Sequence, residues 1–280
     1  MTQTPQIFAH RGAMAYRPQN TLPAFELAWS MGAHGVELDV QCTHDGEVVV
    51  FHDDTLDKLT NGTGRIRDYN AAELMTLDAG AHFSAEYADT RIPTLRQVLR
   101  ARPLGRWVNI ELKTELPDAT PKQLNERLIN GYPVLTRAPD SITERQTKRI
   151  AERAAEVIGD LRAEIPDLAE HLMVSSFHPV AIETFARLCP DIAIAYLRST
   201  ALYHDTEPLV NSMSAVQLSA LHIDAHDTTL EAIAQAHQKG LQVRVWTVND
   251  VAQARTLIRW GVDGLFTNVP DVMLALARTL

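Results

Sequence analysis

Residues 35–53 have the sequence Gly-Val-Glu-Leu-Asp-Val-Gln-Cys-Thr-His-Asp-Gly-Glu-Val-Val-Val-Phe-His-Asp. The first half alternates strictly between apolar and polar residues, which predicts a β-strand with Glu37 and Asp39 on one face. The Asp45-Gly46 pair then predicts a hairpin turn into a second β-rich run. Folding about this turn returns His52 to roughly the level of Asp39. Because polar groups on an otherwise buried strand are costly unless something binds to them, this stretch predicts a functional site.

Strands and helices alternate along the rest of the chain. The turn at 44–47 is far shorter than the crossover of about a dozen residues that parallel neighbours need, so Val48–His52 is not a separate parallel strand. Without it, eight strands remain, most of them followed by a helix, which predicts an α/β fold, a (β/α)₈ TIM barrel. An open doubly wound sheet is the alternative. The eight strands are expected at about 7–9, 36–41, 107–113, 172–177, 192–197, 220–224, 242–248 and 262–267.

The barrel is predicted to form a single domain over residues 1–280, interrupted twice. A small inserted subdomain is expected at about 54–91, after the hairpin, with a short helix near 71–77. A second, Pro-rich excursion is expected at about 114–140. Asn20 is expected to cap the first helix, and Thr94 to start another through a capping box. Further helices are expected to start near Ser141, Pro179, Pro208, Thr228, Asn249 and Pro270.

Composition and charge argue against several classes of protein. The 280 residues are 45% hydrophobic and 22% charged, with a net charge of −9, which argues against a general nucleic-acid partner. Cys42 and Cys189 match no metal-ligand spacing and indicate no disulfide framework. No signal peptide, membrane-spanning run or basic docking helix is recognised. We therefore expect a cytoplasmic protein without stable membrane association, while the oligomeric state is left open.

Ionisable side chains are expected to gather at the carboxyl ends of the barrel strands, where such barrels place their active sites. Three carboxylates facing one cavity repel each other, and oxygen ligands suit Mg²⁺ or Ca²⁺, or Mn²⁺. The alternative is that Arg11 and Lys113 neutralise them as structural ion pairs. Two histidines beside the carboxylates can supply a general acid and a general base. The residues expected at this mouth are His10, Arg11, Glu37, Asp39, His52, Glu111, Lys113, Phe177 and Trp246.

An ordered set of motifs resembles one enzyme family over almost the whole chain. The motifs are His10-Arg11-Gly12, Pro18-Gln19-Asn20-Thr21, Glu37-Leu-Asp39-Val-Gln, Asp45-Gly46…His52-Asp53, Glu111-Leu-Lys113, Trp246-Thr-Val-Asn249 and Gly261-Val-Asp-Gly264. They look like those of the glycerophosphodiester phosphodiesterases.

The resemblance assigns roles to particular residues. It implies that His10 and His52 form the acid–base pair and that Lys113 stabilises phosphate charge. It implies that a divalent cation is bound by Glu37, Asp39 and Glu111. Arg11, Phe177 and Trp246 are expected to contact the substrate.

Two positions depart from the family pattern. Gln19 stands where the family commonly has Glu, and Asn268 where it commonly has Asp. We expect neither to touch the six core positions, which are His10, Glu37, Asp39, His52, Glu111 and Lys113.

The expected reaction is metal-dependent hydrolysis of a small soluble glycerophosphodiester to glycerol 3-phosphate and an alcohol. One alternative is a related phospholipase D-like or cyclising phosphodiesterase that acts on lysophospholipids. Another is a non-catalytic barrel that binds phosphorylated ligands. A phosphosugar isomerase is disfavoured, since Gly261 and Gly264 are too few for its phosphate loop. The preferred headgroup, the metal, the roles of the two histidines and the direct or cyclic route remain open.

Overall fold

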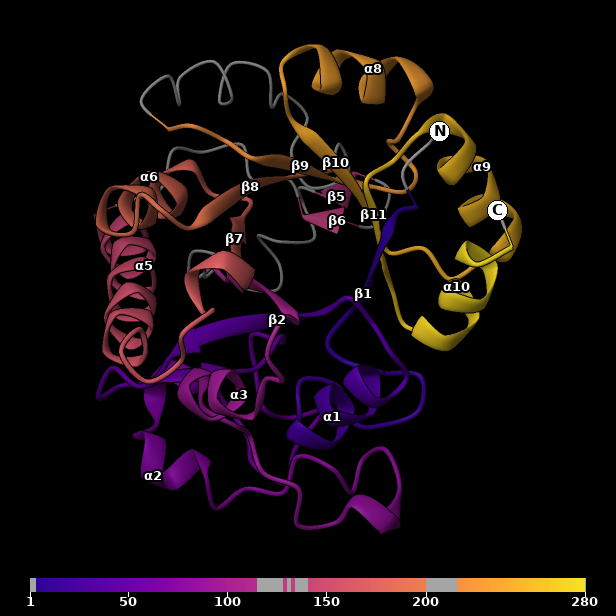
Figure 1. The fold of residues 1–280 in the computed structure, drawn as a ribbon. Coiled ribbons are helices and arrows are strands. Elements are labelled where there is room, and N and C mark those ends of the chain that lie inside the picture. The colour runs from indigo at the N-terminus through magenta and orange to yellow at the C-terminus, as the bar shows by residue number, and fades with distance from the viewer. Residues whose placement is uncertain (1–3, 115–127, 130–131, 134–140, 200–215, 280) are drawn as a thin grey trace.

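The computed structural model describes residues 4–114, 128–129, 132–133, 141–199 and 216–279. In this part of the chain, parallel strands close into a barrel (Figure 1). β1 (Gln6–Ala9) pairs with β2 (Gly35–Cys42) on one side and with β11 (Gly264–Thr267) on the other, which completes the ring. The predicted TIM barrel is confirmed, and the closure excludes an open sheet. Between β2 and β11 the order is β4 (Trp107–Leu112), β7 (Leu172–Ser176), β8 (Ala193–Arg198), β9 (Ala220–Asp224) and β10 (Gln242–Trp246).

The strand β2 takes part in three pairings. It pairs parallel with β4 on one edge. On the other edge its first residues pair with β1 and its last residues pair antiparallel with β3 (Val48–Val50), from Val40↔Val50 to Cys42↔Val48. The predicted hairpin is therefore confirmed. Because the backbone N–H of Phe51 also donates to Asp39 O across 2.9 Å, the chain delivers His52 to the level of the acidic residues.

Gly35 lies where β1, β2 and β4 meet. A Cβ atom there would lie 2.6 Å from Phe8 Cε1 and 2.7 Å from Trp107 O. Distances this short require a neighbour to move, so glycine permits the three strands to approach one another at the start of β2.

Helices surround the barrel (Figure 1). Their inner faces are apolar, as Phe25 and Ala28 on α1 illustrate, and they bury the outer faces of the strands. The expected helix near Pro208 lies outside the described residues. The helices are α1 (Leu22–Ser30), α3 (Leu95–Ala101), α5 (Ser141–Leu161), α6 (Pro179–Leu188), α8 (Leu230–Gln238), α9 (Val251–Trp260) and α10 (Pro270–Ala277).

The cap predicted for the first helix is one residue early: the observed N-cap is Thr21 rather than Asn20. The helices expected to start near Thr228 and Asn249 have Thr229 and Asp250 as their N-caps. In each case two adjacent residues could cap a helix, and another contact occupies the first of them; Thr228 Oγ1, for example, donates to Asp224 O across 2.8 Å. The capping box at Thr94 is confirmed.

Residues 54–91 form an excursion on the side of the barrel that carries α1 and α3, at the lower edge of Figure 1. It contains η1 (Ile66–Asp68), α2 (Ala71–Leu74) and η2 (Ala85–Tyr87), and a small apolar cluster of its own. Of the second excursion, at 114–140, mainly the short pair β5 (Leu128–Ile129) and β6 (Tyr132–Pro133) is described. Among the described residues, no helix has both the length and the apolarity needed to cross a membrane.

Candidate active site

A cavity of about 130 Å³ opens at the carboxyl ends of the strands. Every residue predicted for the site lines it except Asp39, which is 1% exposed and contacts two of the lining residues. The fold therefore brings the predicted residues together. The lining residues are His10, Arg11, Glu37, His52, Asn109, Glu111, Lys113, Phe177, Leu197, His222, Trp246 and Phe266.

The three acidic residues come from two neighbouring strands. Asp39 on β2 lies beside Glu111 on β4 in the parallel register, and Glu37 precedes Asp39 by two residues on the same face. One carboxylate oxygen from each lies within 4.8 Å of the other two. This all-oxygen set matches the ligands that Mg²⁺, Ca²⁺ and Mn²⁺ prefer, so it could hold such an ion.

The charges around these acids are unevenly compensated. Burial, together with the Asp39 and Glu111 carboxylates, raises the pKa of Glu37 well above its usual value. Burial acts in the same direction on Asp39, but positive groups led by the Arg11 guanidinium more than offset it and lower the pKa of Asp39. The positive groups that offset burial at Asp39 therefore do not offset it at Glu37.

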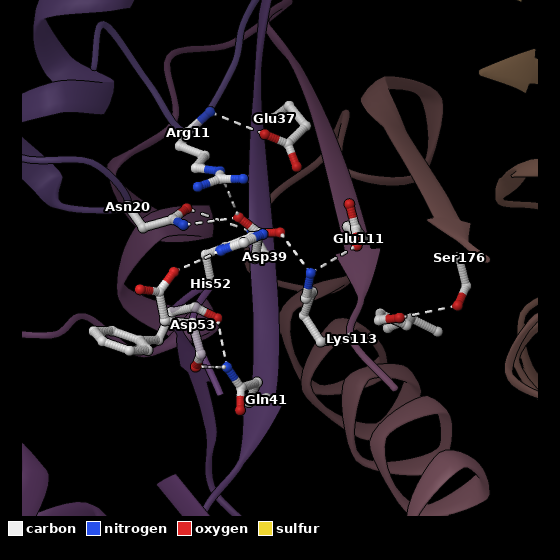
Figure 2. Close-up of polar contacts among 12 residues, drawn as sticks. Arg11, Asn20, Glu37, Asp39, Gln41, His52, Asp53, Glu111, Lys113 and Ser176 are labelled. Atoms are coloured by element: carbon white, nitrogen blue, oxygen red, sulfur yellow. Dashed lines mark hydrogen bonds and ion pairs between the residues drawn. The ribbon is translucent and has the colours of Figure 1, made fainter. Parts of the chain in front are cut away.

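Lys113 joins two of the acids (Figure 2). Its Nζ lies 3.2 Å from Glu111 Oε1 and 3.8 Å from Asp39 Oδ1. Burial alone would lower the pKa of Lys113, but the two carboxylates outweigh it and raise that pKa. Lys113 is thus a charged ammonium at the edge of the cavity.

His10 follows β1 and contacts two residues at the end of β11, Thr267 and Asn268. Its Nδ1 lies 2.8 Å from Asn268 Oδ1, and its backbone N–H donates to Thr267 O across 2.9 Å. Its Nε2 lies 4.0 Å from Glu37 Oε2. Burial, and the neighbouring Arg11 charge, lower the pKa of His10 to about 3. Since the amide oxygen only accepts, the ring carries its proton on Nδ1 and turns Nε2 toward the acids.

His52 is held in a comparable way (Figure 2). Its Nδ1 lies 2.8 Å from Asp53 Oδ1. The Gln41 amide fixes the surrounding backbone, because its Nε2 donates to Phe51 O across 3.0 Å and to Asp53 O across 2.9 Å. Since Nδ1 is engaged with Asp53, Nε2 is the ring nitrogen of His52 that can act on a molecule in the cavity.

Arg11 contacts the acids through both backbone and side chain. Its backbone N–H donates to Glu37 Oε2 across 2.9 Å, and its Nε lies 3.3 Å from Asp39 Oδ2. Its Nη1 donates to Gln19 Oε1 across 2.7 Å. Gln19 thus contacts Arg11 but none of the six positions, as expected. The same expectation was wrong for Asn268, which contacts His10.

Asn20 contributes to the site rather than to the helix cap predicted for it. It adopts a left-handed backbone conformation, with φ 56°, and its Nδ2 donates to Asp39 Oδ2 across 2.8 Å (Figure 2). The adjacent Thr21 leaves Asn20 free for this contact, because Thr21 takes the cap position. The sequence signal was present, since Asn is among the few residues that tolerate this conformation.

Two aromatic rings form one wall of the cavity. Phe177 follows β7 and Trp246 ends β10, and their centroids lie 5.7 Å apart at an interplanar angle of 82°. Trp246 Nε1 donates to His222 O across 3.2 Å, which fixes the indole. Both rings thus lie where they were predicted.

Asn109 and His222 also line the cavity, and both were missed as site residues. The pattern that could have found them is alternation. Asn109 shares a face with Glu111, and His222 shares one with the strand end at Asp224. A polar residue at the inward position of a barrel strand was the available signal.

Comparisons with known proteins agree with this geometry. The sequence profile of the glycerophosphoryl diester phosphodiesterase family matches residues 10–272. The chain is 31% identical over 275 residues to the glycerophosphodiester phosphodiesterase of Caldanaerobacter subterraneus subsp. tengcongensis, covering 97% of each protein. It is 32% identical over 268 residues to that of Bacillus altitudinis, covering 95% of each.

A solved structure extends the likeness to the fold. The structure of an Oleispira antarctica phosphodiesterase in complex with the product sn-glycerol-3-phosphate matches with a TM-score of 0.80 and 28% identity, over 98% of this chain and 97% of that one. Since the profile covers nearly the whole sequence and full-length relatives exceed 30% identity, the chain belongs to the glycerophosphoryl diester phosphodiesterase family and is an enzyme of that class.

Proposed function

We propose that the protein hydrolyses small glycerophosphodiesters to glycerol 3-phosphate and a free alcohol, with a divalent cation bound to Glu37, Asp39 and Glu111. One observation carries the proposal: the three carboxylates share a cavity with two histidines, each held at Nδ1 by an oxygen acceptor. This combination supplies the parts that phosphodiester hydrolysis needs, which are a cation site, a base and an acid.

The metal site is argued from the donor set. Burial and mutual repulsion disfavour three adjacent carboxylates unless positive charge balances them, and at Glu37 the neighbouring side chains do not offset these effects. Mg²⁺, Ca²⁺ or Mn²⁺ would neutralise the acids and, once bound, would polarise a phosphoryl oxygen. The ordering of Asp39 by Asn20 and Arg11 supports a prepared site.

The two histidines would exchange protons through Nε2. With the Nδ1 proton donated to Asn268 or Asp53, a neutral ring presents a lone pair at Nε2 and a charged ring presents a proton. One ring would take a proton from the attacking hydroxyl, and the other would protonate the departing alcohol. The nucleophile is water, or the glycerol 2-hydroxyl in a cyclising first step.

The remaining side chains would position the substrate. Lys113 and Arg11 bring positive charge to the phosphate oxygens as negative charge develops on them. The apolar wall of Phe177 and Trp246 would contact the carbon skeleton and exclude water from one side. A product-bound relative, the Oleispira antarctica enzyme with sn-glycerol-3-phosphate, supports the glycerol phosphate half as the recognised portion.

The experiment compares substrates by phosphorus NMR in buffer with Mg²⁺ or Ca²⁺. Glycerophosphocholine, glycerophosphoethanolamine and glycerophosphoglycerol should each yield glycerol 3-phosphate. A lysophospholipid in vesicles is the competing substrate, and bis(p-nitrophenyl) phosphate the unspecific one. Phosphocholine, or a cyclic phosphate as the final product, would contradict the reaction proposed, and a preference for the vesicle lipid would contradict the soluble substrate.

A further inference from the structure

The cavity contains polar atoms that the proposed reaction does not use. Within the described part of the chain, Asn109 Oδ1 and both ring nitrogens of His222 are buried without a hydrogen-bond partner. Asn109 is 2% exposed and His222 0% exposed, yet both line the cavity. A buried polar atom left without a partner is costly, so a ligand that hydrogen-bonds to these atoms gains affinity.

Asn109 lies deeper in the barrel than Asp39 and Glu111. It precedes Glu111 by two residues on β4, roughly 6–7 Å along the strand at about 3.3 Å per residue, and it pairs in register with Glu37. His222 pairs in register with Arg244, which is 1% exposed. The Arg244 guanidinium lies over the Phe8 ring at 5.4 Å and donates to Gln6 and Gln242, the first residues of β1 and β10, across 2.9 Å each. Arg244 and Phe8 therefore close the barrel beneath, and Asn109 and His222 form the floor of the cavity.

The chemistry of the floor matches a hydroxyl group rather than a phosphate. Asn109 Nδ2 already donates to Ser175 Oγ across 3.0 Å, which leaves an acceptor facing the cavity. Burial, together with the Arg244 charge, lowers the pKa of His222 well below its usual value, so the ring is neutral and offers one donor and one acceptor. A hydroxyl both donates and accepts, whereas the oxygens of a phosphodiester anion only accept and would face the Asn109 lone pairs.

We propose that Asn109 and His222 form a hydroxyl-binding subsite for the terminal hydroxyl of the substrate's glycerol moiety. The inference rests on the proposed function, since the phosphate must lie near Lys113 and Arg11 at the mouth. The terminal hydroxyl is the one farthest from phosphorus, and it alone reaches the floor. Leu197 and Phe266 beside the subsite supply apolar surface for the glycerol carbons. At about 130 Å³ the cavity is much larger than the roughly 10–15 Å³ that one water requires.

A closed floor also selects against lipids. An acyl chain esterified to the terminal oxygen removes its proton and adds bulk where Arg244 and Phe8 close the barrel. The subsite thus gives a structural reason for a preference for deacylated diesters over 1-acyl lysophospholipids.

The experiment uses the purified full chain with Mg²⁺ and three substrates: glycerophosphocholine, its analogue without the terminal hydroxyl and its analogue without the 2-hydroxyl. The wild type should lose kcat/KM on the order of 10²-fold or more without the terminal hydroxyl, because sites built around a hydroxyl reject analogues that lack it. The ratio of kcat/KM for glycerophosphocholine to kcat/KM for the analogue without the terminal hydroxyl measures this discrimination. In Asn109→Leu and in His222→Phe this ratio should fall below about 10. His222→Asn keeps a donor and an acceptor and should retain a higher ratio. The loss of kcat/KM on the analogue without the 2-hydroxyl should stay the same in these variants as in the wild type.

The matched control is His226→Phe, the same substitution at a side chain that is 91% exposed, and it should keep the wild-type ratio. Circular dichroism checks folding, and substitution at either of the two floor positions tests the subsite independently. A wild type indifferent to the terminal hydroxyl, or floor variants that slow all substrates equally, would overturn the inference. If the wild type hydrolyses none of the diesters, the proposed function itself fails, which is a different result.

Discussion

Asn20 and Asp39 are joined by two hydrogen bonds. Asn20 Nδ2 donates to Asp39 Oδ2 across 2.8 Å, and the Asp39 backbone N–H donates to Asn20 Oδ1 across 3.4 Å. The pair is buried, with Asn20 3% and Asp39 1% exposed. A residue just before a helix thus orients a carboxylate on a barrel strand.

Replacing Asn20 with Ala should therefore weaken cation binding. The outer partners of metal ligands typically contribute 10–100-fold to affinity or activity, and we expect a loss in that range. The measurement is the Mg²⁺ concentration that gives half-maximal hydrolysis of glycerophosphocholine. Asn70→Ala, at the cap of α2, is the control and should leave that concentration unchanged. Equal behaviour of the two variants would show that Asn20 does not prepare the site.

Removal of divalent cations should abolish hydrolysis, because the three carboxylates then repel each other and no Lewis acid is present. Adding Mg²⁺, Ca²⁺ or Mn²⁺ after removal of the chelator should restore activity, and Glu37→Gln should require more of the ion. Metal analysis of the purified protein accompanies the assay. Full activity in excess chelator, with no metal retained, is incompatible with the proposal.

His10→Ala and His52→Ala should each lower kcat by about 10²–10⁴-fold, the usual contribution of a positioned acid or base. Stability should change little, because both residues lie at the cavity rather than in the apolar core. His226→Ala is the control, since that ring is 91% exposed. A similar loss in His226→Ala would show that the effect is not specific to the site.

Asn268→Ala should lower kcat by roughly 10–100-fold with a smaller change in KM, because the His10 ring loses the acceptor that orients it. Asn268→Asp keeps an oxygen at that position and should recover most of the rate. Steady-state kinetics on glycerophosphocholine measure both. If the Ala and Asp variants lose the same activity, Asn268 is not acting through an oxygen acceptor.

Away from the site, Asp167 should support stability in a pH-dependent way. Its bond to Arg102, whose side chain is 0% exposed, outweighs burial and lowers the pKa of Asp167 from 3.8 to about 2. Because the pKa of Asp167 is lower in the folded state, the ionised carboxylate stabilises the fold fully at pH values above the unfolded-state pKa of about 4. This contribution is lost as the pH falls through the folded-state pKa of about 2. Asp167→Asn should therefore cost about 1–2 kcal/mol of unfolding free energy at pH 7.

Urea unfolding at several pH values tests this. The difference between wild type and Asp167→Asn should be constant from pH 7 to 5 and shrink below pH 4. Asp160→Asn is the control, because Asp160 is 64% exposed in its pair with Arg96, and exposed pairs contribute about 0–1 kcal/mol. A difference that stays constant down to pH 2 would contradict the assigned ion pair.

The barrel and the residues at its mouth could be predicted from sequence because both depend on short-range regularities. Alternation along β2 and β4 determines which side chains face inward, and the Asp45-Gly46 turn determines that His52 returns to Asp39. The parallel register then places Asp39 beside Glu111. Only the pairing of neighbouring barrel strands, which the fold class supplies, had to be assumed for these residues to meet.

The partners that orient the site could not be predicted in this way. His10 and Asn268 are separated by 258 positions, and nothing local to either indicates the other. Asn20 and Thr21 are both acceptable caps, and only the presence of Asp39 decides between them. Such choices depend on tertiary contacts, which override local preference.

The closure of the barrel has a consequence for the timing of synthesis. β1 is translated before its neighbour β11 and before Thr267 and Asn268, which contact His10. A nascent chain can therefore carry all three carboxylates and both histidines while β1 still lacks one of its two neighbours. Domains fold as their sequence emerges, and contacts between distant segments form late. We therefore expect fragments that end before β11 to be inert, because their barrel is open and His10 lacks its hydrogen-bond partners.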